Sequence, residues 1–438
     1  MQILIIILFI AILIVLITVG KINTFLSFLV VSIAAGIALG IPLDKLGNSV
    51  KTGIGETAGS LTVIIVLGAM LGKLVAESGA AKKIASVLVT AFGAKHIQWA
   101  LMITGFIVGI PLYYGVGFIL LVPLIFSIVY QYKLPAVYIG LPMLAALSVT
   151  HGFLPPHPSP VALASLFKAD LGLTLVYGLL VAIPAIIMAG PVFASTLKKI
   201  DTEPLELFQQ HEKDVYQEPG IGNSFFATLL PVFLLILLTI IQHSASKAFS
   251  GSTLFAFISD PSVVMIVSLA AATYTIGIRQ GMSMKHVMDI YANAVKDIAM
   301  ILLIIAGSGI LKQVMTDSGV SAELAAALQK LPVHPLVLGW LIAALIRACV
   351  GSATVAALTA AGVILPLMMQ SHINPNLMVL SVGAGSLMFS HVNDAGFWMF
   401  KEYFGLSVKD TLRSWSIMEM IVSVVGLTGV LVLNLFIK

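Results

Sequence analysis

The sequence predicts an all-α, polytopic membrane protein made of two inverted repeats with re-entrant hairpins and broken helices. Three observations support this fold class. The chain of 438 residues is 59% hydrophobic and only 10% charged, with a mean hydropathy of +1.08. Apolar stretches occur along the whole sequence, and several of them are interrupted by glycine and proline. The two halves also share polar residues and prolines at a constant separation.

The low content of charged residues excludes most other classes of protein. A soluble domain carries about a quarter charged residues, so this chain has too few to cover a surface that faces water. A disordered activator and an ordinary cytosolic enzyme are excluded for the same reason. The net charge of +4 is small and the positive residues are scattered, which argues against a nucleic-acid partner. A single cysteine, Cys349, excludes an internal disulfide framework.

Apolar stretches that suit membrane helices follow one another along the chain. About 20 apolar residues cross a bilayer, so the composition suffices for about ten or more spans. We expect the first stretch to be a retained helix, because it lacks the basic region and cleavage site of a signal peptide. In the first half the apolar stretches lie at residues 2–19, 25–39, 58–76, 97–112, 116–131, 136–150, 160–167 and 172–194. In the second half they lie at residues 224–242, 262–278, 298–311, 336–350, 352–369, 376–391 and 415–437.

One long charged segment, from Lys198 to Asn223, separates the two halves. We therefore expect a first transmembrane half at residues 1–194, a hydrophilic loop at 195–223, and a linking span with the second half at 224–438. The extra apolar stretch at 224–242 would invert the second half relative to the first.

An internal repeat relates the two halves at a separation of 240 residues. Glu77-Ser78-Gly79 corresponds to Asp317-Ser318-Gly319, and Pro135 corresponds to Pro375. His151 corresponds to His391. The matched residues are the rare polar ones and prolines, so chance agreement in an apolar sequence does not explain them. Repeated halves with matching breaks are typical of secondary transporters, whose binding site lies at the repeat interface.

Two of the breaks are rich in small residues. The first runs from Gly109 to Gly117, between apolar stretches too short to span singly, and the second runs from Arg347 to Thr354. Irregular backbone is tolerated at membrane depth only where it is buried in protein or lines a cavity. Each break therefore predicts the tip of a re-entrant hairpin where the backbone approaches a ligand closely.

Arg347 is one of only three arginines in the chain, and it lies within an apolar stretch. An arginine in the middle of a span costs about 2.5–3.5 kcal/mol even on the insertion scale, which indicates a function. Its planar guanidinium suits a carboxylate, which predicts contact with an anionic substrate. The alternative is that Arg347 forms an internal pair, with Asp394 as the partner, or extends to the membrane interface.

The other two breaks carry the histidines. The third, residues 150–160, has four prolines within six residues and cannot continue a helix. Ser159 and Pro160 suit the start of a new half-helix, whose positive end would stabilise an anion. The fourth, residues 390–397, contains Asp394 and His391, which could carry a proton or coordinate a cation. Each histidine could equally be structural.

These segments resemble the gluconate:proton symporter family. The resemblance rests on residues 151–158, His-Gly-Phe-Leu-Pro-Pro-His-Pro, and on residues 390–394, Ser-His-Val-Asn-Asp. It includes residues 345–347, 351–356, 397–398 and 401–404, and it extends over essentially the whole chain. One departure is Gly115, which stands where relatives usually carry a glutamate after two aromatic residues.

The resemblance implies a secondary active transporter, not an enzyme, that imports gluconate or a related sugar acid across the bacterial cytoplasmic (inner) membrane by proton symport. It also implies membership of the ion-transporter superfamily, whose members are typically homodimers with a scaffold domain and a mobile elevator domain that bears paired hairpins. No cofactor and no metal are expected. The expected partners are the sugar acid, the proton, the lipid bilayer and a second copy of the chain.

On this reading, Arg347 and the half-helix that begins at Ser159 hold the substrate carboxylate. The substrate hydroxyls also need partners, since an unsatisfied buried polar group costs about 1–3 kcal/mol. The candidates for these hydroxyls are Ser352, Thr354, Asn393 and Tyr114. His157 is a further candidate for substrate binding. The candidates for proton coupling are Asp394, His151 and His391.

Two alternatives remain. Hairpin tips rich in Gly, Ser, Thr and Asn offer oxygen ligands, so the chain could be a sodium-coupled carrier of small organic anions. A remote alternative is an intramembrane metallohydrolase with zinc held by His151, His157, His391 and Asp394. The residue types suit zinc, but no metal-ligand spacing on one helix face is evident.

Overall fold

The computed structural model is all-helical, which confirms the prediction of an all-α fold. It describes residues 2–112, 114–200, 202, 218–244, 252–320, 323, 327, 330, 332–370, 373–391 and 394–437. No β-strand occurs within these residues. Most of the expected hydrophilic loop at 195–223, namely residue 201 and residues 203–217, lies outside them.

Two sets of helices, separated by that loop, make up the fold. The first set comprises α1 (Gln2–Thr18), α2 (Thr24–Ala38), α3 (Leu43–Glu77), α4 (Ala80–Phe92), α5 (Ile97–Gly109), α6 (Tyr114–Tyr132), α7 (Ala136–Phe153), α8 (Pro158–Phe167) and α9 (Leu171–Ile187). The second comprises α10 (Ile221–Ser244), α12 (Thr253–Ile258), α13 (Pro261–Ala272), α14 (Met284–Asp317), α16 (Pro335–Val350), α17 (Ala353–Gln370), α18 (Pro375–Gly385), α19 (Ala395–Tyr403), α20 (Val408–Thr411) and α21 (Ile417–Phe436). Short 3₁₀ or π turns lie at Ala94–His96, Met188–Val192, Ser195–Leu197, Thr273–Gly277, Ile278–Gln280 and Leu412–Ser416.

Several of these helices are long and apolar enough to cross a membrane. Six helical segments of the described chain meet this test, and a bent pair formed by α3 and α4 makes a seventh. Five other apolar helices, namely α1, α2, α5, α16 and α17, are shorter, at 10–17 residues. The number of candidate spans is lower than the composition allows, because glycine and proline breaks divide the remaining apolar sequence into these short helices.

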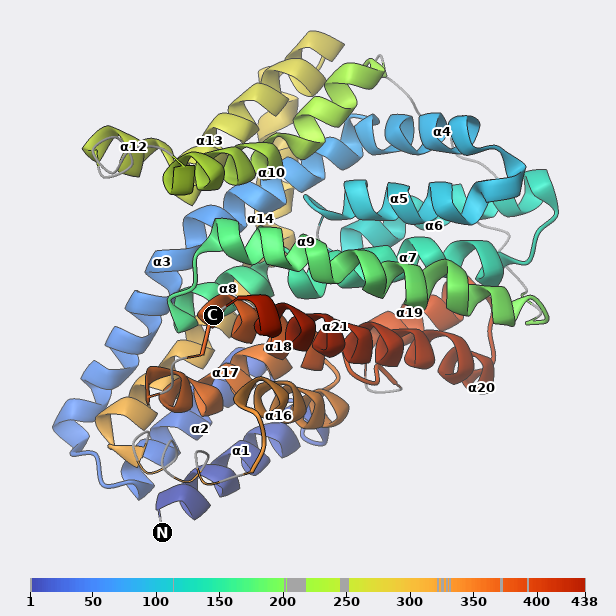
Figure 1. The fold of residues 1–438 in the computed structure, drawn as a ribbon. Helices are drawn as coiled ribbons and strands as arrows, with labels where there is room; N and C mark the ends of the chain where they lie inside the picture. Colours follow the sequence, from blue (N-terminus) through green and yellow to red (C-terminus); the bar gives the residue numbers. More distant parts are fainter. Residues whose placement is uncertain are drawn as a thin grey trace.

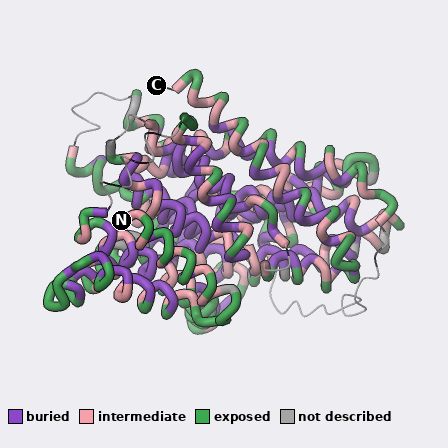
Figure 2. The backbone as a smooth tube through the Cα atoms, turned by 90° about the horizontal axis from the view of Figure 1, so that it is seen from below, coloured by how far each residue is buried: buried purple, intermediate pink, exposed green. Residues whose placement is uncertain are grey.

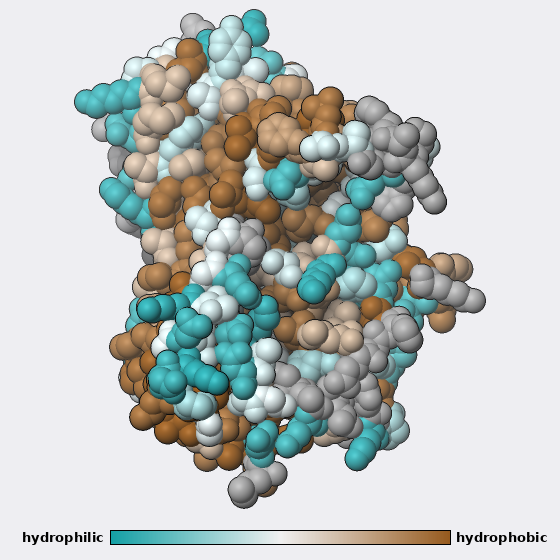
Figure 3. Space-filling model, turned by 90° about the vertical axis from the view of Figure 1, so that its left-hand side faces the viewer, coloured by the Kyte–Doolittle hydropathy of each residue, from teal (hydrophilic) through white to brown (hydrophobic). Residues whose placement is uncertain are grey.

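Apolar side chains cover much of the outside of the bundle. Figure 2 shows the buried residues along the inner faces of the helices and the exposed ones along the outer faces. Phe233, Met369 and Leu435 are 62%, 77% and 75% exposed. Figure 3 shows apolar side chains at the surface across the middle of one face. Such an apolar surface suits contact with lipid. The helices also satisfy their own backbone hydrogen bonds, which lipid cannot do.

The order of the helices recurs in the two halves. In each half a long helix, α3 or α14, precedes a helical hairpin, α5–α6 or α16–α17, and then a broken helix, α7–α8 or α18–α19 (Figure 1). The packing recurs as well, because α5 packs on α7 and α16 packs on α18, while α3 and α14 pack on each other. The repeat inferred from the sequence therefore corresponds to two similar sets of helices. Their inversion relative to the membrane stays a prediction.

The helices end within the segments that the sequence marks as breaks, except α18, which ends at Gly385, before the fourth break. The hairpin turns fall between α5 and α6 and between α16 and α17, and the other breaks separate α7 from α8 and α18 from α19. The two broken helices approach each other through glycine, since a Cβ atom on Gly383 would lie 2.4 Å from the carbonyl oxygen of Gly152. This close approach brings parts of the two halves together near the breaks.

Candidate functional site

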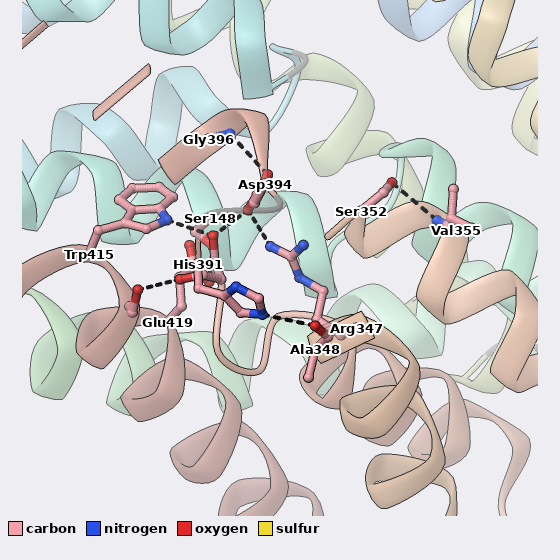
Figure 4. A network of polar contacts seen from close by, with 12 residues as sticks. Ser148, Arg347, Ala348, Ser352, Val355, His391, Asp394, Gly396, Trp415 and Glu419 are labelled. Carbon is pink, nitrogen blue, oxygen red and sulfur yellow. Dashed lines mark hydrogen bonds and ion pairs between the residues drawn. The ribbon is translucent and has the colours of Figure 1, made fainter. Parts of the chain in front are cut away.

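A cavity of about 520 Å³ lies where the four breaks meet. The first half contributes the polar lining residues Lys21, Thr24, Tyr114, Ser148 and His151. The second half contributes Arg347, Ser352, Thr354, Asp394, Trp415 and Glu419. Figure 4 shows the part of this cluster that surrounds Arg347. A concave site with a few convergent polar groups is the usual form of a small-molecule binding site.

Arg347 and Asp394 form an ion pair at the centre of this cluster. The Nη2 group of Arg347 donates to Oδ2 of Asp394, and their side chains are 4% and 15% exposed (Figure 4). Asp394 also accepts a hydrogen bond from the amide of Gly396 at 2.9 Å, so its carboxylate caps α19. The internal pair that the sequence left open is therefore present, and it fixes the guanidinium in place.

The ion pair leaves part of the guanidinium without a partner. Within the described residues, Nε and Nη1 of Arg347 are buried and make no hydrogen bond. Buried donors of this kind cost about 1–3 kcal/mol each unless a ligand or water satisfies them. Arg347 can therefore hold Asp394 and still offer donors to an anion.

Ser390 and Trp415 also support the carboxylate of Asp394. Ser390 donates its hydroxyl hydrogen to Oδ2 of Asp394, and Nε1 of Trp415 donates to Oγ of Ser390 at 2.7 Å. Trp415 lies in the π turn before α21 and is 2% exposed. The network connects the break before α19 to the last helix, so the position of the ion pair depends on both.

The start of α17 presents a helix N-terminus to the cavity. Gly351 adopts a left-handed conformation with φ +78°, which ends α16 and allows the tight turn. Ser352 accepts a hydrogen bond from the amide of Val355 at 3.4 Å, which leaves its hydroxyl hydrogen available. Thr354 follows and also lines the cavity. The amides of a first helical turn have no acceptor within the helix and favour an anion.

Tyr114 lines the cavity from the start of α6. Its ring lies 6.0 Å from that of His151 and 6.1 Å from that of Trp415, measured between centroids. Its hydroxyl group is buried and makes no hydrogen bond to any described residue. Gly115 beside it has open space, because an added Cβ atom would meet nothing within 4 Å. The position of Gly115 therefore has room for a larger side chain.

Glu419 is a lining residue that the sequence reasoning missed. It lies in the first turn of α21, is 2% exposed, and accepts a hydrogen bond from Oγ of Ser148 at 2.9 Å. It falls within the apolar stretch 415–437, which carries no glycine–proline break to draw attention to it. The signal was nevertheless present, because an ionisable residue within a membrane span indicates a functional site by default.

The remaining predicted residues occupy other positions. His151 lines the cavity, whereas Nε2 of His157 donates to the carbonyl of Gly109 at 2.8 Å and lines a separate small pocket. Nε2 of His391 contacts the carbonyl of Ala348 at 2.8 Å, outside the cavity lining. Ser159 is buried near the start of α8 and does not line the cavity either. Asn393 lies outside the described residues.

The structure thus brings together Tyr114, His151, Arg347, Asp394 and the start of α17, and it places His157, Ser159 and His391 elsewhere. Within the described residues, no group of three or more His, Cys, Asp or Glu side chains is arranged to hold a metal ion. The arrangement can bind an anion through the guanidinium and the helix N-terminus, and it holds a second acid in Glu419.

Comparisons with known proteins agree with this architecture. The family model described as GntP family permease matches residues 1–436. The chain is 46% identical to a high-affinity gluconate transporter of Escherichia coli and 46% identical to a gluconate permease of Bacillus subtilis, with 95% of each chain covered in both comparisons. It is 45% identical to the Gnt-II system L-idonate transporter of Escherichia coli, with 97% of each chain covered.

A solved structure shows the same fold. The YdaH transporter of Alcanivorax borkumensis, described as having an unusual topology, matches with a TM-score of 0.65 at 18% identity. The match covers 93% of this chain and 96% of that one. The family model and the relatives at 45–46% identity are permeases and transporters, which shows the family. The chain therefore belongs to the GntP permease family and is a multi-pass membrane transporter.

Proposed function

We propose that this protein imports gluconate or a related sugar acid across the cytoplasmic membrane together with a proton. The observation that carries the proposal is a cavity at the helix breaks around which donors of Arg347 and Tyr114 have no partner among the described residues. A hydroxylated monocarboxylate has the acceptors that these donors need. The relatives named as gluconate and L-idonate transporters support the same class of substrate.

In this proposal the carboxylate of the substrate lies between Arg347 and the start of α17. The ion pair with Asp394 holds the guanidinium, and Nη1 and Nε remain to donate. The first-turn amides of α17, at Ala353 and Thr354, add the positive end of a helix. A guanidinium and a helix N-terminus acting on one carboxylate favour a monoanion over a neutral sugar.

The hydroxyl groups of the substrate would pair with polar side chains further along the cavity. Ser352, Thr354 and Tyr114 line it, and Ser352 retains a hydroxyl hydrogen to donate. At about 520 Å³ the cavity falls within the usual range for small-molecule sites, about 300–1,000 Å³. Each hydroxyl–hydroxyl pair replaces a hydrogen bond to water that the substrate loses on entering the site.

The proposed transport cycle follows from the architecture. Two similar sets of helices, with hairpins and broken helices at corresponding places, are expected to form inverted repeats around one site that opens to each side in turn. We propose that the part carrying the hairpins moves as an elevator against the rest and that the protein is a homodimer. Asp394, His151 and His391 remain the candidates for proton coupling from the sequence.

The test is uptake of labelled gluconate into liposomes that contain the purified protein. An imposed proton gradient, inside alkaline, should drive accumulation, and a protonophore should abolish it. Arg347→Ala should remove saturable uptake, whereas the matched Arg279→Ala, at an exposed arginine outside the cavity, should leave it unchanged. Normal uptake by Arg347→Ala would refute the proposed site.

A second pair of conditions separates the two coupling ions. With the proton gradient intact and no sodium present, proton symport predicts full accumulation. With a sodium gradient and no proton gradient, it predicts none. The opposite result would assign the chain to the sodium-coupled class instead.

A further inference from the structure

Glu419 is the one buried acid lining the cavity that has no cation beside it within the described part of the chain. Asp394 pairs with Arg347, but no Lys, Arg or His nitrogen of a described residue lies within 4.0 Å of the carboxylate of Glu419. Its hydrogen bond comes from Oγ of Ser148, at 2.9 Å, across from α7 (Figure 4). A hydrogen bond from a hydroxyl does not neutralise the charge of a carboxylate. Glu419 therefore lacks the neutralising cation that Asp394 has in Arg347.

The cavity lining that contains Glu419 also includes Lys21, an exposed cation between α1 and α2. The other charged and titratable groups of this lining come from four elements. His151 lies on α7, Arg347 on α16, Tyr114 at the start of α6, and Asp394 at the cap of α19. Of the further elements packed on α21, α18 and the turn Met188–Val192 carry no titratable side chain. Tyr177 on α9 does not line the cavity, and Arg413 in the π turn Leu412–Ser416 is exposed.

The balance of charge in the cavity depends on Glu419. Arg347 and Asp394 cancel each other, so an ionised Glu419 leaves the buried lining with one excess negative charge. A substrate carboxylate that enters such a site meets a like charge with little water to screen it. A proton on Glu419 removes this repulsion. Anion binding and protonation of Glu419 therefore favour each other, and by linkage the effect is reciprocal.

We propose that Glu419 is the proton-binding residue that couples proton uptake to the binding of the anionic substrate. The inference rests on the proposed function, because it concerns how the sugar-acid site is coupled. A proton from the water on the uptake side binds the Glu419 carboxylate, the substrate anion binds beside Arg347, and both leave on the other side. Ser148 is a positioning residue that donates to the ionised carboxylate and can accept a hydrogen bond from the protonated one.

The test counts the protons taken up when gluconate binds to the purified protein. Gluconate is added in a weakly buffered solution with a pH indicator, and binding is measured in parallel by calorimetry. At a pH where Glu419 is ionised in the free protein, the wild type should take up nearly one proton per gluconate. Its affinity should fall nearly tenfold for each further unit of pH.

Glu419→Gln keeps the size of the side chain and removes the titration. This variant should bind gluconate with an affinity that no longer varies with pH over that range, and it should take up no proton. In liposomes it should still exchange internal for external gluconate, but it should not accumulate gluconate in response to a proton gradient. Glu402→Gln, at an exposed glutamate on α19, is the matched control and should behave as the wild type.

The outcomes distinguish this inference from the proposed function. If the wild type binds no gluconate, the proposed substrate is wrong. If the wild type takes up protons with gluconate and Glu419→Gln does so equally, the inference about Glu419 is overturned while the function stands. If proton uptake on gluconate binding is lost in Asp394→Asn or His151→Gln but not in Glu419→Gln, coupling belongs to a residue expected from the sequence.

If Glu419→Gln fails to bind gluconate, infrared difference spectra of Glu419→Asp decide the matter. Addition of gluconate to the wild type should produce the carbonyl stretch of a newly protonated carboxyl group. In Glu419→Asp that band should shift in frequency, because the protonated group has a different side chain and different hydrogen bonds. A band at the same frequency in both proteins would show that another residue takes the proton.

Discussion

Replacing Arg347 by methionine, alone and together with Asp394→Asn, separates the structural role of this arginine from its role in substrate binding. Methionine keeps an unbranched apolar side chain and removes the charge. Asp394→Asn removes the opposite charge and keeps an oxygen that can accept from the amide of Gly396, so the cap of α19 is retained. The two changes together remove both charges of the ion pair, so neither partner is left as an unpaired charge.

The expected magnitudes follow from the burial of the pair. With side chains only 4% and 15% exposed, Arg347→Met should lower the free energy of unfolding by about 3–5 kcal/mol, because Asp394 is left as an uncompensated charge. The double variant should recover at least half of that loss. Gluconate binding should not recover, since a lost charge-assisted hydrogen bond costs about 1.5–3 kcal/mol, or about 10–150-fold in Kd.

Stability would be measured by reversible unfolding in detergent mixtures and gluconate affinity by calorimetry on the same preparations. Recovery of stability without recovery of affinity would support a direct role for Arg347 in binding. Recovery of both in the double variant would refute it, because Arg347 would then serve only to neutralise Asp394. An additive loss of stability in the double variant would contradict the ion pair itself.

Three further changes test other parts of the structure. His157→Ala should lower the free energy of unfolding by about 1–3 kcal/mol, because it leaves a buried carbonyl without its donor; a thermal-denaturation assay of the purified protein checks this, and an unchanged midpoint would contradict the contact. Gly383→Ala should destabilise the protein by about 1–3 kcal/mol, since its Cβ would lie 2.4 Å from the carbonyl oxygen of Gly152. Gly362→Ala on α17, where an added Cβ meets nothing within 4 Å, is the control and should be neutral or slightly stabilising in the same assay. Lys21→Gln should raise the KM for gluconate about twofold at low ionic strength and have no effect at high salt, because Lys21 is an exposed cation of the cavity lining; an effect that persists in high salt would indicate direct contact instead.

The helix breaks could be predicted from the sequence because their cause is local. Proline removes a backbone donor and glycine permits the left-handed turn at Gly351, so both mark the ends of helices without knowledge of the fold. The pairing of Arg347 with Asp394 was foreseen as an alternative for a similar reason. Charged residues are scarce in the spans, so Asp394 was one of few partners that a buried Arg347 could have.

The composition of the site could be predicted only in part. Which side chains of a break face the cavity depends on how the two halves pack. The sequence alone therefore did not show that His157 and Ser159 point elsewhere. Glu419 was overlooked because it lies in an unbroken apolar run, and its bond to Ser148 joins residues 271 positions apart. Such contacts arise from tertiary packing and leave no local pattern.

The two halves contribute different chemistry to the cavity, although the order of their helices is similar. Its inner charged side chains, Arg347, Asp394 and Glu419, all belong to the second half. The first half supplies one exposed charge, Lys21, and neutral polar groups such as Tyr114 and Ser148. A molecule with an acid at one end and alcohols along its length would thus have a single preferred way to lie within it. A cavity built from two copies of one half would lack either the inner charges or the neutral polar groups of the first half. The two similar sets of helices frame the cavity, and the different side chains that they carry give it a direction.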